Sequence, residues 1–334
     1  MVTRPEMSTS QCVVTGANGF LGREIVSRLL MSGVSMSATD ISSACSTPGV
    51  QYHQADILQE QQLSPVVESA STVIHAAGLA HIFSPRTVDK DLFDKVNAVG
   101  TKNMATTAAE AGIAHFILIS SVSVYGPFTH GMYSEDNSCH PVGAYAESKY
   151  NAELEAQEIA HKSGMALTIL RLATLYGERD PGNMVRLIRT LDRGSFFWIG
   201  DGSNRKSLLY KADAARACLA VASRPANGVS IYNVSAPPCT MRDIVDGLSM
   251  ALEKKPLPIR IPAPIALTAG KFISCLPERR LSRLYSTLEK WLAEDVYVTS
   301  RIERDYGFHT QIDLIEGLKR EVRWYLQNKG KIFQ

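Results

Sequence analysis

The chain lacks an excess of charge of either sign. Its 334 residues include 35 Lys and Arg against 33 Asp and Glu, for a formal net charge of +2. Nucleic-acid-binding domains need a basic surface that neutralises phosphates, so this balance predicts no nucleic-acid partner. With 45% hydrophobic and 20% charged residues, the composition is that of a globular protein with one large domain or two closely joined ones.

Cysteine is scarce and shows no ligand pattern. Neither Cys-x-x-Cys pairs nor Cys/His ligand spacing occurs among Cys12, Cys45, Cys139, Cys218, Cys239 and Cys275. We therefore expect no metal site and reduced thiols in a cytoplasmic protein.

Long apolar runs are also missing. No run of eighteen apolar residues occurs, so we expect no membrane-spanning helix, and the polar residues 1–10 lack the apolar core of a signal peptide. The nearest apolar stretch, 261–276, is broken by two prolines and a lysine, and three arginines follow it. Two interpretations of residues 261–283 remain: a packed helix of a substrate domain, which the pattern favours, or a segment that lies on a membrane surface.

A glycine-rich turn stands between a strand pattern and a helix pattern near the start of the chain. An apolar run at 12–14 leads into residues 15–22, Thr-Gly-Ala-Asn-Gly-Phe-Leu-Gly, and helical periodicity follows. Gly16 can make the tight turn, Gly19 lets a backbone approach a pyrophosphate, and Gly22 lets helix and strand pack closely. The helix N-terminus offers N–H groups and a partial positive charge to phosphates. The predicted cofactor contacts in this turn are Gly16, Asn18, Gly19, Phe20, Leu21 and Gly22.

An acidic residue follows the second strand pattern. Residues 34–39 end in Asp40, eighteen positions past Gly22, and neither Arg nor Lys follows closely. A carboxylate there can accept hydrogen bonds from the ribose hydroxyls of NAD and would repel the 2′-phosphate of NADP. The sequence thus predicts NAD as the cofactor.

Strand and helix patterns alternate from residue 11 to about residue 173. This alternation predicts an α/β fold, a Rossmann doubly wound parallel sheet whose ligands bind beyond the carboxyl ends of the strands. The expected strands are 11–15, 34–39, 50–54, 72–76, 115–120 and 166–171. The expected helices are 20–33, 59–69, 89–112 and 143–163.

More candidate cofactor contacts lie at the ends of these strands and in the long fourth segment of the pattern. They are Asp56, Ile57, Ala76, Ala77, Gly78, Asn97 and Leu172. Asp56 either meets the adenine or caps the helix that follows it. The small residues at 76–78 leave room for a bound cofactor, and Asn97 is expected to support the site by tying backbone segments together.

Three further residues suit proton transfer at a carbinol. Ser121 ends the fifth strand, and Tyr145 and Lys149 have the i, i+4 spacing that places both on one helical face. A phenol has an unperturbed pKa of about 10, and we expect the nearby ammonium of Lys149 to lower it. Tyr145 and Lys149 are also candidate cofactor contacts, since Lys149 can bond the nicotinamide ribose. Ser121 can donate to the substrate oxygen. This combination predicts catalysis beside a hydride acceptor.

These motifs resemble the extended short-chain dehydrogenase/reductase family over nearly the whole chain. The matching segments are Gly16-x-x-Gly19-x-x-Gly22, His75-Ala-Ala-Gly78, Ser121…Tyr125-Gly126, Tyr145-x-x-x-Lys149, Arg171…Tyr176-Gly177, Gly200-Asp201-Gly202 and Arg304…Phe308. The resemblance implies NAD(P) chemistry, usually on a sugar carried by a nucleoside diphosphate. It also implies a homodimer built through a four-helix bundle, to which helices 89–112 and 143–163 contribute.

The resemblance further implies a smaller α/β substrate domain interleaved with the C-terminal part of the chain. We expect the NAD-binding domain at 9–178 with returning segments at about 206–236, and the substrate domain at 179–205 and 237–330. The candidate substrate contacts are Ser123, Thr174, Arg179, Asn183, Arg205 and Lys206. The cations and the amide among them suit a diphosphate, although a solvated surface charge is the alternative for each cation.

The residues after Ser121 distinguish between chemistries within this family. Relatives that remove water carry an Asp-Glu pair there, and decarboxylating relatives carry a Glu nearby, whereas this chain has Val122 and Ser123. We therefore expect redox chemistry at a hydroxyl carbon. The favoured prediction is a 4-epimerase of a nucleoside-diphosphate sugar that works through a keto intermediate.

Two alternatives stay open. The first is a net reductase or dehydrogenase of a keto sugar or another secondary alcohol. Thr174 stands where sugar-nucleotide epimerases often have an Asn that binds the diphosphate, and Ala80 stands where some have a Lys. The second, minor alternative is an NAD sensor without turnover. Such proteins usually lack the Tyr or the Lys that this chain retains.

Overall fold

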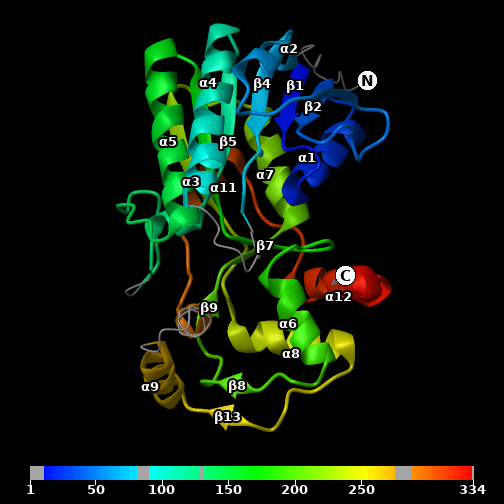
Figure 1. Ribbon diagram of the computed structural model, residues 1–334, viewed down its shortest axis with the longest axis vertical. Helices are drawn as coiled ribbons and strands as arrows, with labels where there is room; N and C mark the ends of the chain where they lie inside the picture. Colours follow the sequence, from blue (N-terminus) through cyan, green and yellow to red (C-terminus); the bar gives the residue numbers. More distant parts are fainter. Residues whose placement is uncertain (1–10, 81–89, 128–130, 275–286, 333–334) are drawn as a thin grey trace.

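The computed structural model describes residues 11–80, 90–127, 131–274 and 287–332. Its centre is a seven-stranded parallel sheet in the order β11-β6-β5-β4-β1-β2-β3, which fills the upper half of Figure 1. The strands are β1 (Gln11–Thr15), β2 (Met36–Asp40), β3 (Gln51–Gln54), β4 (Ala70–His75), β5 (His115–Ser121), β6 (Ala166–Leu172) and β11 (Val229–Val234).

Helices cover both faces of this sheet (Figure 1). One face carries α1 (Phe20–Met31) and α7 (Lys211–Ala222), and the other carries α4 (Gly100–Glu110) and α5 (Ala144–Ser163). Shorter elements beside them are η1 (Glu60–Gln62), α2 (Ser64–Val67), α3 (Lys90–Asp94), the π-helical turn η2 (Lys95–Val99) and the 3₁₀ turn η3 (Val122–Tyr125).

Alternating side chains divide the apolar residues of the sheet between two cores. Val14 and Ile117 pack in the core beneath α1 and α7, whereas Val13 and Phe116 pack in the core beneath α4 and α5. All four side chains are completely buried. A doubly covered parallel sheet requires this pattern, because each strand must be apolar on both faces.

A third core lies outside the sheet, in the lower half of Figure 1. It joins α6 (Asn183–Asp192), α8 (Met241–Leu252) and α12 (Leu314–Ile332). Two-stranded ladders surround it: β7 (Thr174–Tyr176) with β10 (Leu208–Tyr210), β8 (Trp198–Ile199) with β13 (Arg260–Ile261), and β9 (Arg205–Lys206) with β12 (Cys239–Thr240). The remaining helices are α9 (Ala263–Ser274) and α11 (Ser300–Tyr306).

The predicted α/β fold with a parallel sheet is confirmed, and each expected strand lies within two residues of the observed one. The expected helix 59–69 is wrong: the segment forms one 3₁₀ turn and a four-residue helix. Pro65 lies at the start of that short helix, and Ser69 adopts a left-handed φ of 66° that turns the chain into β4. The expected helix 89–112 is interrupted by the π-helical turn, and its residue 89 lies outside the described residues.

Within residues 206–236, β11 pairs with β6 and α7 packs beside α1. The polar residues 1–10, and residues 275–283 of the segment expected to form a packed helix or to lie on a membrane surface, lie outside the described residues. Among the helices that the structure describes, none has the length and hydropathy needed to cross a bilayer.

Candidate active site

The glycine-rich turn joins β1 to α1 under tight steric limits. Gly16 has a φ of +66°, and a Cβ atom there would lie 2.6 Å from the Cα atom of Ala77. A Cβ atom on Gly22 would lie 2.0 Å from the carbonyl oxygen of Gly16. Both positions therefore require glycine. Helix α1 begins after Gly19 without a side-chain cap, so its first N–H groups are available to phosphate oxygens.

The carboxylate of Asp40 is held next to this turn. Its Oδ2 atom accepts the N–H of Asn18 at 3.0 Å, and its Oδ1 atom accepts the N–H of Ser42 at 3.2 Å and the hydroxyl of Ser42 at 3.1 Å. The Asn18 side chain in turn bonds Ala44 and Ser46, at 2.9 and 2.7 Å. A carboxylate fixed on the last residue of β2 fits a ribose diol, since each oxygen has further acceptor capacity.

A cavity of about 350 Å³ opens beside the turn. Its lining combines residues of the turn and of α1 with residues of the 178–181 segment and Lys211, and it includes the carboxylates Glu24 and Glu178 as well as three cations. Arg179 is exposed and has a left-handed φ of 72°. The structure thus places Arg179 next to the dinucleotide turn, whereas the sequence suggested the substrate diphosphate. The open amides of α1, the exposed Arg179 and the carboxylate of Asp40 together fit a dinucleotide.

Asp56 has a local structural role. Its Oδ1 atom accepts the N–H of Leu58 at 3.0 Å, and its own N–H donates to Gln62 at 2.9 Å. This arrangement is an Asx turn that leads into η1. It is similar to the helix-capping role that the sequence analysis gave as the alternative for Asp56. Ile57 is buried, and its carbonyl accepts the side-chain amide of Asn103 at 3.1 Å. An adenine contact by either residue stays a prediction.

Asn97 joins three segments around the site. It is buried in the π-helical turn, accepts the N–H of Leu79 at 2.7 Å, and donates to the Leu79 carbonyl at 3.0 Å and to Ser148 Oγ at 2.9 Å. A Cβ atom on Gly78 would lie 2.8 Å from Asn97 Oδ1. Asn97 therefore fixes the segment after β4 against α5, which is the supporting role that the sequence suggested.

A buried polar chain that the sequence did not reveal runs beneath this segment. The N–H of Ala77 donates to Thr15 Oγ1 at 3.1 Å, Thr15 bonds His75 Nδ1 at 2.8 Å, and His75 Nε2 bonds Thr101 Oγ1 at 3.1 Å. Thr101 donates to the Asn97 carbonyl at 2.5 Å. These directions assign neutral His75 the tautomer with the proton on Nε2. Burial, together with the charge of Lys149, lowers the pKa of His75 to about 3.

Ser121, Tyr145 and Lys149 come together at the carboxyl end of β5. Ser121 pairs in register with Leu172 of β6, and its Oγ atom accepts the N–H of Ser123 at 3.2 Å. The same hydroxyl lies close enough to the Tyr145 phenol to act against the rise of its pKa. The Tyr145 ring packs edge-on against Phe93, with centroids 6.1 Å apart. The Lys149 ammonium donates to the carbonyl of Ile119, two residues before Ser121. The three side chains predicted to be catalytic thus share one site.

The expected lowering of the Tyr145 pKa is wrong for the protein by itself. Burial raises the pKa of the phenol, and only the Ser121 hydroxyl opposes that shift. Burial also lowers the pKa of Lys149 from 10.5 to about 8, with the charge of Glu153 acting in the opposite direction. The ammonium bonds a backbone carbonyl, so the phenol is neutral before ligands bind.

A buried ion pair lies one helical turn beyond Lys149. Glu153 accepts the Ser120 hydroxyl at 2.5 Å and the Arg171 guanidinium at 2.7 and 3.0 Å, and neither charged side chain is more than 4% exposed. The guanidinium lies 4.9 Å from the ring centroid of Tyr125. The pair connects α5 to β5 and β6. Sequence reasoning used Arg171 only as part of a motif and missed Glu153.

The candidate substrate contacts are scattered. Ser123 Oγ is buried and has no hydrogen-bond partner among the residues that the structure describes. Thr174 and Asn183 are exposed, at the starts of β7 and α6. Arg205 pairs with Glu294 at 3.2 Å, and the buried Lys206 pairs with Asp295 at 2.8 Å. These ion pairs join β9 to residues 294–295. Both cations are therefore already paired with carboxylates of the protein, and neither is positioned to bind a diphosphate.

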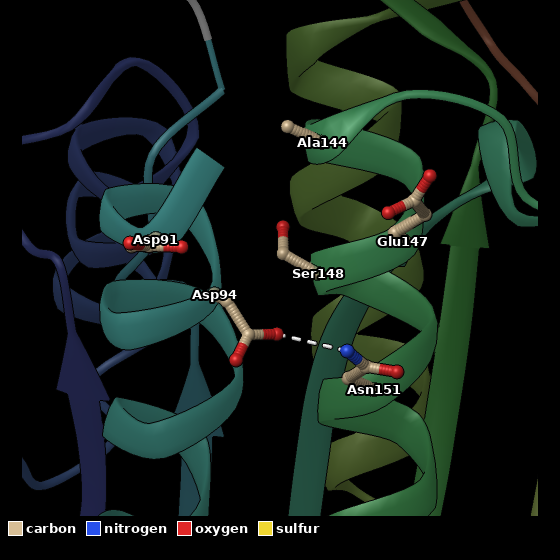
Figure 2. Close-up of a pocket in the computed structure, with 6 residues that line it drawn as sticks. All are labelled: Asp91, Asp94, Ala144, Glu147, Ser148 and Asn151. Carbon is tan, nitrogen blue, oxygen red and sulfur yellow. Dashed lines mark hydrogen bonds between the residues drawn. The ribbon is translucent and has the colours of Figure 1, made fainter. Parts of the chain in front are cut away.

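A second cavity, of about 240 Å³, lies between α3 and α5. Figure 2 shows its lining side chains projecting from the two helices toward one another, with the Asn151 amide donating to Asp94 at 2.8 Å. Neither Tyr145 nor Lys149 lines this cavity, so it is separate from the three clustered residues. No group of three or more metal-ligating side chains converges within the described part of the chain.

Comparisons with known proteins agree with this geometry. The family model described as "NAD dependent epimerase/dehydratase family" matches residues 12–235. The uncharacterized protein y4nL of Sinorhizobium fredii is 27% identical over 98% of each chain. The N-acetyl-alpha-D-glucosaminyl-diphospho-ditrans,octacis-undecaprenol 4-epimerase of Escherichia coli O157:H7 is 26% identical over 93% of this chain and 94% of that one. The solved structure of MoeE5 with UDP-glucuronic acid and NAD has a TM-score of 0.77 at 24% identity, and covers 96% of this chain and 100% of that chain.

Proposed function

Because the chain belongs to the NAD-dependent epimerase/dehydratase family, we propose that it inverts a hydroxyl carbon, C4, of a nucleoside-diphosphate sugar through a keto intermediate. The observation that carries the proposal is the convergence of Ser121, Tyr145 and Lys149 at the end of β5. Their strand ends at the same sheet edge as the glycine turn and Asp40. The 4-epimerase activity in the name of the Escherichia coli relative supports the reaction class.

The residues divide the chemistry between them. The glycine turn and Asp40 would hold NAD, which would supply a reversible hydride acceptor for the sugar carbon. Tyr145 takes the hydroxyl proton as the carbinol becomes a ketone, and gives it back when the carbinol re-forms. Ser121 donates a hydrogen bond to the same oxygen. The Lys149 ammonium stabilises the phenolate, which offsets the burial that keeps the free phenol neutral.

We propose the domain division given by the sequence, with an NAD-binding domain at 9–178 and about 206–236, and a substrate domain at 179–205 and 237–330. The separate core of α6, α8 and α12 supports it. In the substrate site we propose a contact from Ser123, because its buried hydroxyl lacks a protein partner among the described residues.

A second candidate is a net reductase or dehydrogenase of a keto sugar. Thr174, where many sugar-nucleotide epimerases have a diphosphate-binding Asn, is the observation that favours it. Its exposed side chain at the start of β7 can still donate one hydroxyl hydrogen bond. A non-catalytic sensor is disfavoured, since the Tyr and the Lys are present and clustered.

One incubation separates these functions. The purified protein is mixed with a panel of nucleotide sugars, while sugar identity and the absorbance of reduced cofactor are followed together. Inversion of the sugar without net change in cofactor means an epimerase. Stoichiometric consumption of cofactor means a reductase or dehydrogenase. Tight NAD binding with neither change would contradict both enzymatic functions and favour the sensor.

We also propose a homodimer in which α4 and α5 of two subunits form a four-helix bundle. Leu92 on α3 and Val99 on η2, the turns that lead into α4, and Leu154 on α5 are 42–47% exposed in the single chain, and dimerisation would bury them. Leu154→Glu is expected to convert the dimer to monomer in sedimentation analysis. The control Met250→Glu, at a 65% exposed position on α8, should leave the mass unchanged. A dimeric Leu154→Glu protein would place the interface elsewhere.

We propose that the enzyme works in the reducing cytoplasm. The five cysteines within the described residues are all free thiols, which supports this location. The incubation with a panel of nucleotide sugars also tests which group carries the sugar. The substrate in the name of the Escherichia coli relative carries its sugar on diphospho-undecaprenol and not on a nucleoside diphosphate.

A further inference from the structure

One segment of the chain concentrates positive charge. Residues 254–271 contain Lys254, Lys255, Arg260 and Lys271, and neither Asp nor Glu. Because the whole chain carries +2 and this segment +4, the remaining residues together carry −2. Lys254 pairs with Asp192 at 2.8 Å, and Lys255 and Arg260 are exposed. The segment is therefore basic in a protein that is otherwise slightly acidic.

The same segment forms an apolar face with β8. Trp198 pairs with Arg260, and the Trp198 N–H donates to the Ile259 carbonyl at 3.0 Å. Trp198 is 7% exposed and belongs to the third core. Successive side chains of a strand point to opposite faces, so Phe197 and Ile259, each one residue before this pair, lie on the outer face. They are 38% and 50% exposed.

Two more large apolar side chains of the same segment are exposed. Leu257, whose N–H donates to the Phe196 carbonyl at 2.8 Å, is 36% exposed. Ile265, in the first turn of α9, is 61% exposed, while the adjacent Ala266 is buried. We call Phe197, Leu257, Ile259 and Ile265 the outer apolar face. In Figure 1, β8, β13 and α9 lie at the end of the molecule opposite the sheet.

The backbone here is suited to contact with an apolar phase. Prolines occupy positions 256, 258, 262 and 264, and proline has no N–H group that must be satisfied away from water. Several neighbouring N–H groups are already bonded, including those of Leu257 and Ala266. Scattered apolar residues on a surface are ordinary, but a group of them flanked by cations is typical of segments that lie in a membrane interface.

We propose that the outer apolar face and its flanking cations dock on the surface of a membrane that contains anionic lipid. The apolar side chains enter the boundary between headgroups and acyl chains, and the cations meet lipid phosphates. The protein lies on the bilayer and does not cross it. The seven-stranded sheet lies at the opposite end of the molecule (Figure 1), so we expect turnover of a soluble substrate without docking.

Vesicle sedimentation of the full-length protein tests this proposal. We expect co-sedimentation with vesicles of phosphatidylglycerol and phosphatidylcholine, weakened by added salt, and little with phosphatidylcholine alone. Ile259→Glu should lower the partition coefficient by more than about tenfold, because it removes an inserted side chain and adds a repelled charge. Met250→Glu, on the exposed side of α8, is the matched control and should bind like wild type.

Equal binding of wild type and Ile259→Glu, or no binding of wild type to either vesicle, would overturn the proposal. A fall in molecular mass of Ile259→Glu in lipid-free buffer would also overturn it, by assigning the face to contacts between copies of the chain. Unchanged turnover of a soluble nucleotide sugar by Ile259→Glu shows that the variant is folded. Tyr145→Phe should bind vesicles normally, so failure of the proposed catalysis and failure of docking are distinguishable.

Discussion

The buried pair of Glu153 and Arg171 allows a stability prediction with a definite magnitude. Glu153 is completely buried and Arg171 is 4% exposed, and their closest atoms are 2.7 Å apart. Glu153→Leu leaves the guanidinium buried without its carboxylate and the Ser120 hydroxyl without its acceptor. Breaking one side of such a pair costs about 3–5 kcal/mol, whereas replacing both partners by apolar residues is often close to neutral.

The assay is urea unfolding followed by tryptophan fluorescence, for wild type, Glu153→Leu, and the double variant with Arg171→Leu. The single variant should lose about 3–5 kcal/mol of unfolding free energy, and the double variant should recover most of that loss. A single variant within about 1 kcal/mol of wild type would refute the reasoning, since surface substitutions typically change stability by less than that. If the double variant were as unstable as Glu153→Leu, the lost unfolding free energy would come from altered side-chain packing and not from the unpaired guanidinium.

The same double variant carries a prediction about pH. Glu153 raises the pKa of Lys149, against a burial that lowers it to about 8. Without the carboxylate, Lys149 loses its proton at lower pH. The alkaline limb of the pH profile of kcat should therefore move to lower pH even when stability has been restored. An unmoved limb in the folded double variant would show that Glu153 has no electrostatic effect on the site.

Three further predictions concern the cofactor and the reacting groups. Asp40→Ala should lower the affinity for NAD more than the affinity for NADP in a binding titration, because it removes the acceptor for the ribose hydroxyls and the repulsion of a 2′-phosphate. Equal losses of affinity for the two cofactors would contradict the ribose contact. Ser121→Ala should slow the single-turnover step by about 10²–10³-fold, and an unchanged rate would remove Ser121 from the site. NAD affinity should fall above about pH 8, where Lys149, with its lowered pKa, loses the proton that its ribose contact needs, and a flat pH profile would argue against that contact.

The parts of the site that the sequence predicted are those set by local geometry. The turn at Gly16 and Gly22 follows from a strand, a left-handed glycine and a helix that are adjacent in the chain. Tyr145 and Lys149 share a helical face because of their spacing. Short helical segments were harder to predict from the sequence. The expected helix 59–69 is a 3₁₀ turn and a four-residue helix, because Ser69 adopts a left-handed φ that the spacing of apolar residues does not indicate.

Contacts between distant segments were beyond sequence reasoning. Lys206 pairs with a carboxylate 89 positions away, so its charge is compensated, which a local pattern cannot show. His75 ends an apolar strand, and nothing in the sequence around it indicates that two threonines from distant segments bond its two ring nitrogens. The raised pKa of Tyr145 also depends on tertiary burial, whereas the sequence offered only the charge of its helical neighbour.

The most direct test of the account follows the sugar and the cofactor in a single turnover of Tyr145→Phe and wild type. NAD binding is measured in parallel. The account predicts unchanged NAD affinity and a rate of sugar oxidation lowered by about 10²–10⁴-fold, because the proton acceptor is gone while the cofactor site remains. Oxidation at the wild-type rate in the NAD-loaded variant would contradict the assignment of Tyr145 as the group that moves the proton.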